Sequence, residues 1–560
     1  MNNRLLATCV AAALALAVNP IAHAQAKITL VNLDEAGVGL NDATPAVPVG
    51  GNPGVTLGQQ RLIAYQYAMD LWGALLRSDT EIRVTASFAP LTCEAGRIVL
   101  GQAGALSRVR ASQIAPGGAT DYDHPVALAN ALAKRDFTPN ANHILTNFSS
   151  SLDLPACQAL GGGGWYYGLT GNAPNKSNRA NFLNVIMHEI GHGLGVSGNS
   201  RMLFGVVPLR SAKSAWDGLA YSNVHARSYN DFAPSGDAEM ARALVTVGQT
   251  VWTGTRVTPT AGLLAENRMV LEISAPTPSR HDFVTVPFGG SNYAVLEDRQ
   301  IQLVDDVAAA GAPPTHNGCD GDSGQPLIAN GAALAGKIAL IDRGGCEFGR
   351  KALNAQKHGA VAVILANNTA GELSGIGGGM VGDQVTLPVI TVTQAVGAEL
   401  RAVANQVAGG LVEDPNRFYG LDANRRLRLY TPSPYAAGSS FSHVDTDMSP
   451  NALMEPAETK TLRGDVTVDV ALDMFEDLGW PTNRNGTAKL GGCDTGVPIY
   501  RDTFIPGANL IAQSNLCKAS AGGSRSRQLR CMNDHISALH RQTLITPLEM
   551  ASARQCVAKL

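Results

Sequence analysis

The stretch His188-Glu189-Ile190-Gly191-His192, followed by Gly193-Leu194-Gly195, is the most informative part of the chain. Two histidines four residues apart lie on one face of a helix, one turn apart, so both imidazoles can bind one metal ion. A glutamate beside the first histidine can reach a water molecule on that metal. This pattern is the signature of zinc hydrolases in which the glutamate acts as general base.

The surrounding residues predict the helix that the motif requires. Apolar side chains recur at steps of three and four residues, which is typical of a buried helical stripe; they are Leu183, Ile186, Ile190 and Leu194. The two histidines fall on another face and are free to point into a cleft. We therefore expect residues 181–194 to form a helix that packs one face on the core.

Length and charge limit the possible functions. A chain of 560 residues suggests more than one domain, and a net charge of −3 gives no sign of a nucleic-acid-binding surface. Its 60 glycines and its 16% of charged residues suit a loop-rich exported protein. We expect protein or peptide substrates and no nucleic acid, and the sequence leaves the oligomeric state open.

The first 24 residues have the features of a signal peptide. Arg4 gives a positive start, residues 5–18 are apolar, and Ala22-His23-Ala24 is a cleavage site. No later segment is apolar enough to span a bilayer. We therefore expect a secreted protein without a membrane span, either extracellular or periplasmic.

The cysteines support export. Cys9 leaves with the signal peptide and eight cysteines remain, an even number that indicates disulfides in an exported chain. Proximity pairs Cys93 with Cys157 and Cys319 with Cys346. The other four form two bonds whose partners the sequence leaves open: Cys493, Cys517, Cys531 and Cys556.

A catalytic zinc needs three protein ligands, and the motif supplies two. In the metzincin group of zinc proteases a third histidine follows three residues after the glycine. Here that glycine is present as Gly195, but Gly198 occupies the ligand position. His443 is the best candidate for the missing ligand, and His225 and Glu239 are alternatives.

The sequence after His443 contains a Leu-Met turn at Met454, and this combination resembles the leishmanolysin-like branch of the metzincins. In that branch a long insertion separates the second and third histidines, and a methionine turn lies beneath the metal. The resemblance implies an endopeptidase with zinc bound by His188, His192 and His443. It also implies an α+β fold, in which a twisted sheet lies beside the active-site helix.

The insertion between the two parts of the motif has its own pattern. Residues 336–348, 359–368 and 387–392 contain buried strands, and residues 351–358 read as a helix. This order resembles the α/β protease-associated (PA) domain. We therefore expect a catalytic domain at residues 25–300 and 416–485, interrupted by a PA domain at residues 301–415. A small disulfide-rich module follows at residues 486–560.

Two further stretches carry weaker signals. Residues 321–326 imitate the nucleophile motif of trypsin-like proteases, but the partner motifs are absent, so we interpret them as a surface turn. Asp320 and Asp322 hint at structural Ca²⁺, which the absence of the other EF-hand ligands leaves unsupported. Residues 161–168 read either as a loop leading to an aromatic edge strand at the cleft rim or as a plain loop and core strand.

The function that the sequence predicts is hydrolysis of peptide bonds by zinc-activated water, with Glu189 as general base and Met454 as an apolar floor beneath the metal. The alternative is an exported binding protein without activity, which acts through its PA domain and Cys-rich tail.

Overall fold

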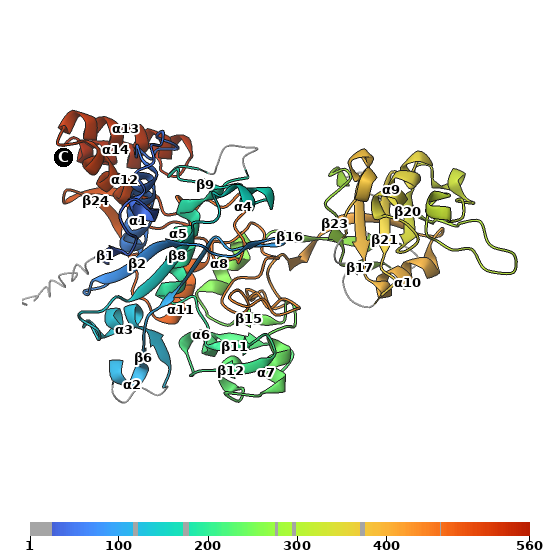
Figure 1. The fold of residues 1–560 in the computed structure, drawn as a ribbon, viewed down its shortest axis with the longest axis horizontal. Helices are drawn as coiled ribbons and strands as arrows, with labels where there is room; N and C mark the ends of the chain where they lie inside the picture. The colour runs from blue at the N-terminus through green and yellow to red at the C-terminus, as the bar shows by residue number, and fades with distance from the viewer. Residues whose placement is uncertain are drawn as a thin grey trace, which may run out of the picture. The chain divides into compact units, whose positions relative to one another are not determined.

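The chain divides into two units, Met1–Ala265 with Gly420–Leu560, and Glu266–Tyr419. The structure is a computed structural model that describes residues 25–115, 121–171, 178–274, 278–293, 298–369, 376–459 and 461–560. The expected signal peptide at residues 1–24 lies outside the described residues. Figure 1 shows the elements of each unit in chain order.

The first unit contains a four-stranded sheet in the order β1-β2-β8-β5. Three strands are parallel and the edge strand β5 is antiparallel. The strands are β1 (Ile28–Asn32), β2 (Ile82–Ala89), β8 (Ile144–Ser149) and β5 (Gly101–Ala105). Both β5 and β8 contact helix α5 (Phe182–Leu194), so the edge of the sheet lies beside the helix that carries the histidine motif.

Helix α1 (Leu57–Leu75) supports α5 from within the core. The Thr56 hydroxyl caps this helix by accepting from the Gln59 N–H at 3.2 Å. Trp72 of α1 is fully buried, and its Nε1–H donates to the carbonyl of Met187, 3.1 Å away. This bond ties α1 to the turn of α5 just before His188.

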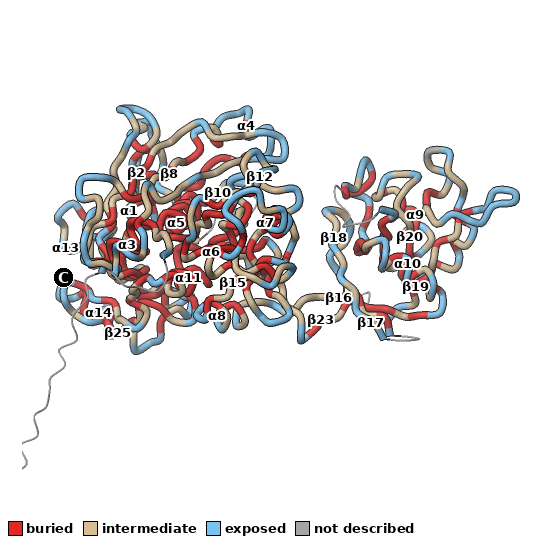
Figure 2. Tube along the Cα trace, turned by 90° about the horizontal axis from the view of Figure 1, so that it is seen from below, coloured by how far each residue is buried: buried red, intermediate tan, exposed pale blue. Residues whose placement is uncertain are grey.

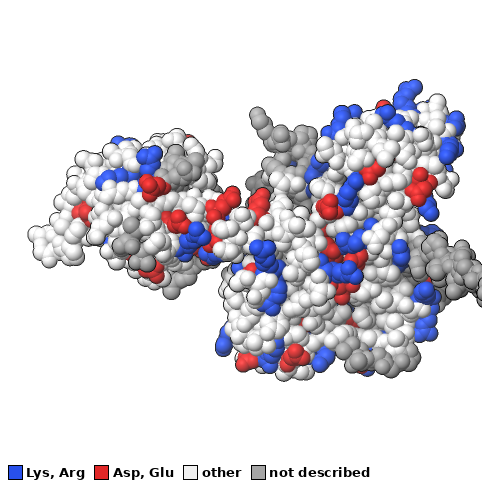
Figure 3. Space-filling view, turned by 180° about the vertical axis from the view of Figure 1, so that it is seen from behind, with Lys and Arg blue, Asp and Glu red and all other residues white. Residues whose placement is uncertain are grey.

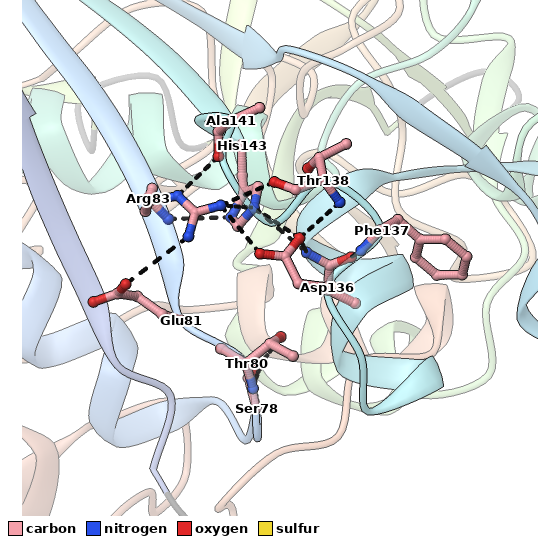
Figure 4. Close-up of polar contacts among 10 residues, drawn as sticks. Ser78, Thr80, Glu81, Arg83, Asp136, Phe137, Thr138, Ala141 and His143 are labelled. Carbon is pink, nitrogen blue, oxygen red and sulfur yellow. Dashed lines mark hydrogen bonds and ion pairs between the residues drawn. The ribbon is translucent and has the colours of Figure 1, made fainter.

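A network of charged side chains holds the loop before β8 against β2 (Figure 4). The Arg83 guanidinium donates to the Asp136 carboxylate at 3.1 Å and to the carbonyls of Thr138 and Ala141. His143, which is fully buried, lies 3.4 Å from the same carboxylate. Burial opposes ionisation of Asp136, but the Thr138 N–H and Arg83 outweigh it and lower the pKa of Asp136. The ion pairs therefore fix the start of β8 beside β2.

The segment before His443 alternates apolar and charged residues, a pattern typical of a strand, but it does not form a continuous one. Residues 426–430 make only isolated bridges, of Leu427 to Leu421, Arg428 to Val251 and Leu429 to Val444. Their alternation of apolar residues is real, because Leu427 and Leu429 are fully buried. The bridge of Leu429 to Val444 brings this segment next to His443.

The second unit has the strand order expected of the insertion. Among the described residues it forms an eight-stranded sheet, whose central strands β19 to β22 are parallel. These are β19 (Arg299–Leu303), β20 (Ile338–Asp342), β21 (Ala362–Ala366) and β22 (Val389–Val392), with helices α9 (Phe348–Lys357) and α10 (Gln394–Val403). Apolar side chains cluster on both faces of this sheet.

The second unit is longer than the PA domain expected at residues 301–415, because it also includes a pair of strands at its beginning and its end. Strand β16 (Asn267–Ile273) pairs antiparallel with β23 (Ala408–Phe418), and the unit therefore begins at Glu266 and ends at Tyr419.

The C-terminal residues form helices that belong to the first unit. They are α12 (Pro506–Ser520), α13 (Arg525–Arg541) and α14 (Pro547–Val557). Residues 486–560 are not a separate compact unit, because α12 packs on α1. Lys and Arg side chains gather over these helices in Figure 3.

The described residues contain four disulfides. Two join the pairs that proximity in the sequence favours, Cys93–Cys157 and Cys319–Cys346. The pairs that the sequence left open are Cys493–Cys556 and Cys517–Cys531. In the described part of the chain, no helix is both long enough and apolar enough to cross a bilayer.

Candidate metal centre

Helix α5 presents its motif from a well-capped start. The side chain of Asn181 accepts from the N–H groups of Leu183 and Asn184, which satisfies two donors at the helix N-terminus. The predicted apolar stripe is buried in full: Leu183, Ile186, Ile190 and Leu194 are each 1% exposed or less. Figure 2 shows α5 as a mostly buried element, and this packing turns the histidine face toward the cleft.

The three histidines that the sequence singled out lie together. Nε2 of His192 is 2.9 Å from Nε2 of His188 and 3.1 Å from Nε2 of His443. The possible ligand atoms of the three rings all lie within 4.8 Å of one another, and no other such group is found among the described residues. Three nitrogens around one zinc ion would lie about 3.3 Å apart at the usual bond length of roughly 2.05 Å, so this spacing suits a tetrahedral site.

Each ring is oriented by a backbone carbonyl. The Nδ1 atoms of the three histidines lie 2.6 to 2.7 Å from the carbonyl oxygens of Leu453 (His188), Val196 (His192) and Ser439 (His443). A carbonyl only accepts, so each Nδ1 carries the proton and each Nε2 presents a lone pair. Three lone pairs that face one another repel unless a cation lies between them, so the donor set fits a metal ion.

Burial keeps the three rings neutral. It lowers the pKa of His188 to about 3 and that of His192 to about 4, and it lowers the pKa of His443 well below its usual value. The other histidines add to the effect at His188 and His443. Metal ligands must be deprotonated, so the site is in the form that binds metal at neutral pH.

Gly198 lacks a side chain because Phe441 occupies its space. A methyl group at Gly198 would lie 2.2 Å from Cε1 of Phe441, whose ring is fully buried. The Gly198 N–H donates to the Ser442 hydroxyl at 3.1 Å. The segment that contains His443 therefore packs against the position where the contiguous motif would have its third histidine.

The turn at Met454 connects the first and third histidines. The carbonyl of Leu453 accepts from His188, and the carbonyl of Met454 accepts from the N–H of Val444 at 2.9 Å. The side chain of Met454 is fully buried. In turn, the Leu453 N–H donates to the buried Asp469 carboxylate at 2.6 Å, which fixes the turn.

Glu189 lies in the same cleft, beside the edge strand. Its carboxyl group is close to Gly101 of β5, where an added methyl would lie 2.5 Å from Oε1. Burial raises the pKa of Glu189 to about 8. A carboxyl with a pKa near neutrality is suited to accept and release a proton at physiological pH.

The alternative ligands lie in other environments. Glu239 pairs with Arg227 and is 3.8 Å from Nδ1 of His225, and neither belongs to the histidine group. Asp320 is 3.1 Å from Nε2 of His358, and Asp322 is 3.4 Å from Nε of Arg350. Both aspartates thus have cationic or histidine partners, and no observation here supports Ca²⁺ at this turn.

The histidines and Glu189 line a cleft of about 1240 Å³. The edge strand at this cleft is β5, which contributes Gly101, Gln102 and Ala103. The aromatic strand β9 (Trp165–Tyr166) is buried and pairs with β10 (Ala180–Asn181), so it is a core strand and only Gly161 and Gly162 reach the rim. No pattern in the sequence indicates strand β5, because its residues are small.

Comparisons with known proteins match parts of the chain. The PA domain family matches residues 302–400. Leucine aminopeptidase 2 of Arthroderma otae is 42% identical over 77 residues, which cover 14% of each protein. The ER degradation-enhancing alpha-mannosidase-like protein 3 of Xenopus laevis is 41% identical over 75 residues, which cover 12% of this chain and 8% of that protein. The chain thus spans about a tenth of the length of these relatives.

Solved structures give a similarly local likeness. The zinc aminopeptidase BSAP from Bacillus subtilis is 18% identical, with 29% of this chain and 37% of that chain covered and a TM-score of 0.17. So low a score does not establish a common fold. The peptidases named here are aminopeptidases, so the metzincin resemblance rests on the histidine site alone. What the comparisons establish is that residues 302–400 of this chain are a PA domain.

Proposed function

We propose that this protein is a secreted zinc endopeptidase whose metal ligands are His188, His192 and His443. The observation that carries the proposal is the convergence of three neutral imidazole Nε2 atoms, 2.9 and 3.1 Å apart, next to a buried glutamate. Three histidines suit zinc better than Ca²⁺ or Mg²⁺, which prefer oxygen ligands. When bound, zinc supplies a Lewis acid that polarises a carbonyl oxygen and makes water a nucleophile at neutral pH.

The side chains of the protein have separate roles in this proposal. Glu189 accepts a proton from the attacking water at its carboxylate and passes it to the leaving amine. The carbonyls of Leu453, Val196 and Ser439 hold the rings in one tautomer. Met454 binds nothing; its buried side chain provides an apolar floor beneath helix α5.

An extended polypeptide fits the cleft better than a small molecule. Its volume of about 1240 Å³ exceeds the range of about 300–1,000 Å³ for small-molecule sites. Strand β5 lies at the edge of its sheet and lines the cleft, so a substrate strand can pair with its backbone. These features support cleavage within a chain and the leishmanolysin-like ligand arrangement, with the catalytic parts on either side of the PA domain.

Export is part of the proposal. Four disulfides suit an oxidising compartment, either outside the cell or in the periplasm.

Substitution of the proposed base tests the mechanism. Glu189→Gln keeps the shape of the side chain but removes its basicity, so we expect bound zinc to remain and hydrolysis of casein to fall by about 10² to 10⁴-fold. Glu239→Gln, outside the histidine group, is the matched control and is expected to retain activity. Chelation should abolish activity and added zinc should restore it. Wild-type protein that binds no zinc and cleaves nothing would favour the inactive binding protein.

A peptide with a blocked N-terminus and the same peptide with a free N-terminus distinguish an endopeptidase from an aminopeptidase. An internally quenched peptide with a blocked N-terminus is cleaved by an endopeptidase and resists an aminopeptidase. We expect cleavage of the blocked peptide. If only the unblocked form is cleaved, the protein is an aminopeptidase, as the names of its partial relatives say of those proteins.

A further inference from the structure

The hairpin of β11 (Ser200–Leu203) and β12 (Val207–Arg210) exposes an apolar tip. Phe204 is 94% exposed, Val206 is 70% exposed and Val207 is 46% exposed. Exposed apolar residues are ordinary when scattered, but three within four positions of one turn are unusual. The hairpin follows helix α5 in the chain and lies beside α7 (Ala238–Ala243), where Figure 1 shows both strands at one edge of the unit.

The base of the hairpin is firmly attached to the protein. The Arg210 N–H donates to the Pro234 carbonyl at 2.7 Å, and the Gly236 N–H donates to the Pro208 carbonyl at 3.0 Å. The buried Arg210 guanidinium donates to the Tyr229 carbonyl. The tip therefore projects from a fixed support and is not a loose loop.

The backbone holds the aromatic ring outward at a cost. Phe204 has a φ of 52°, in the left-handed region that bulky residues rarely adopt, and Gly205 follows with a φ of 73°. Such conformations cost about 1 to 3 kcal/mol and are often found where function requires them. The hairpin turn requires this conformation, since the Val206 N–H donates to the Leu203 carbonyl at 3.1 Å, but the ring itself gains no burial and remains almost entirely exposed.

The charges within the hairpin and just after it are of one sign, whereas Glu239 of the neighbouring α7 is acidic and pairs with Arg227. Residues 200–213 contain Arg201, Arg210 and Lys213 and no acidic residue, although the whole chain has a net charge of −3. Arg201 and Lys213 are exposed. A projecting apolar tip with cations at its base matches a bilayer surface, in which acyl chains lie beneath anionic headgroups.

We propose that the β11–β12 hairpin is an interfacial anchor, which inserts Phe204, Val206 and Val207 into an anionic lipid surface while Arg201 and Lys213 bind the headgroups. The shape of the tip favours lipid over a protein partner. A convex tip can insert among lipid acyl chains, but it has no pocket that could bind a side chain of another protein. Tyr435, which lines the cleft, lies beside the backbone N–H of Met202 in β11. The anchor would therefore hold the cleft close to the membrane.

Vesicle binding tests the proposal with the whole protein and without substrate, so the result is independent of peptidase activity. Vesicles of phosphatidylcholine, with and without about one third phosphatidylglycerol, are sedimented with the protein. We expect binding to the anionic vesicles that weakens at high salt. The double variant Phe204→Ser with Val206→Ser should bind about tenfold more weakly or worse, because the apolar contacts are lost.

A matched variant controls for general loss of surface hydrophobicity. Leu263, on α8 (Val257–Leu264), is 85% exposed, so Leu263→Ser removes a comparable exposed side chain elsewhere and should leave binding unchanged. Phe204→Trp gives a direct reading: its emission should shift to the blue on binding and be quenched by brominated acyl chains.

Three outcomes would overturn the proposal: no sedimentation of the wild-type protein with either vesicle, equal loss in the Leu263→Ser variant, or no quenching of the tryptophan at position 204. If the hairpin double variant keeps its vesicle binding but binds casein more weakly, the tip is a docking site for protein substrates instead.

Discussion

Gly191 lies directly against Met454, so the second histidine turn of α5 rests on the methionine turn. A methyl group at Gly191 would be 2.8 Å from the Met454 sulfur and 3.2 Å from its Cε. Met454 is fully buried and has little room to move. The glycine inside the motif is therefore a packing requirement, set by a residue 263 positions later in the chain.

This contact predicts that Gly191→Ala destabilises the protein. Alanine gains about 1 kcal/mol of helix propensity, whereas overpacking costs about 1 to 3 kcal/mol in a filled core. We expect overpacking to win and Gly191→Ala to lower both stability and zinc affinity. Met454→Ala alone leaves a cavity and costs about 2 to 5 kcal/mol.

The double variant Gly191→Ala with Met454→Ala should cost at least about 1 kcal/mol less than the sum of the single variants, because each change fills or opens the same space. Urea unfolding of the four proteins measures this coupling. Strictly additive effects would show that the two residues do not press on each other.

Substitution of a second glycine, Gly101, tests the role of Glu189 in proton transfer without changing the metal ligands. Gly101 faces Glu189, with Oε1 only 2.5 Å from an added methyl, whereas a methyl at Gly104 of the same strand meets nothing within 4 Å. We expect Gly101→Ala to displace the carboxylate and lower kcat by about tenfold or more, with zinc content unchanged. Gly104→Ala should behave like the wild type. Equal kcat values for the two variants would contradict the position proposed for Glu189.

The features predicted from sequence are those that depend on local pattern. Helix α5 follows from the spacing of its apolar residues, and the strands of the second unit follow from continuous apolar runs such as residues 338–342. His443 and Met454 were singled out through a family resemblance, and the structure places both beside α5. Their roles remain a proposal.

The features missed from sequence depend on distant contacts. No local pattern shows that Phe441 fills the space beside Gly198, or that the Leu453 carbonyl orients His188. Strand β5 consists of glycine, alanine and glutamine, which are poor strand formers, and its pairing with β8 determines its structure. The sequence predicts a separate C-terminal module, because no local pattern shows that α12 packs on α1, which lies near the opposite end of the chain.

The packing of α12 and α13 makes stability depend on pH through His535. Burial lowers the pKa of His535 from 6.5 to about 4, and its Nε2–H donates to Asn509 Oδ1 at 2.6 Å. Between these two values the unfolded chain binds a proton that the folded chain does not. Stability is therefore complete above pH 6.5 and falls as the pH is lowered toward 4.

His535→Gln removes this titration. We therefore expect the free energy of unfolding of the variant to fall less steeply with pH than that of the wild type. At pH 5 the two slopes should differ by the equivalent of up to about one bound proton. Urea unfolding at pH 7 and at pH 5 compares the two slopes, and any constant cost of the substitution cancels. Parallel curves would show that His535 titrates normally in the folded protein.

The Cys319–Cys346 disulfide should stabilise the second unit alone. Both cysteines lie within Glu266–Tyr419, and the bond closes 27 residues, for which loop entropy predicts about 3 to 4 kcal/mol. All five tryptophans lie outside that unit, so their fluorescence reports only the first. We expect the double variant Cys319→Ser with Cys346→Ser to unfold its second unit at a lower temperature, as measured by circular dichroism. The midpoint of the transition measured by tryptophan fluorescence should not change.

The opposite result is expected for Cys517→Ser with Cys531→Ser, whose bond closes 14 residues in the first unit and is worth about 3 kcal/mol. This second double variant should lower the midpoint of the unfolding transition that tryptophan fluorescence measures. Because α12 packs on α1, and α1 supports the turn before His188, the same change should also weaken zinc retention. If both double variants shift the tryptophan transition equally, the two units unfold together. In that case the effect on the histidine site could not be assigned to the contact of α12 with α1 alone.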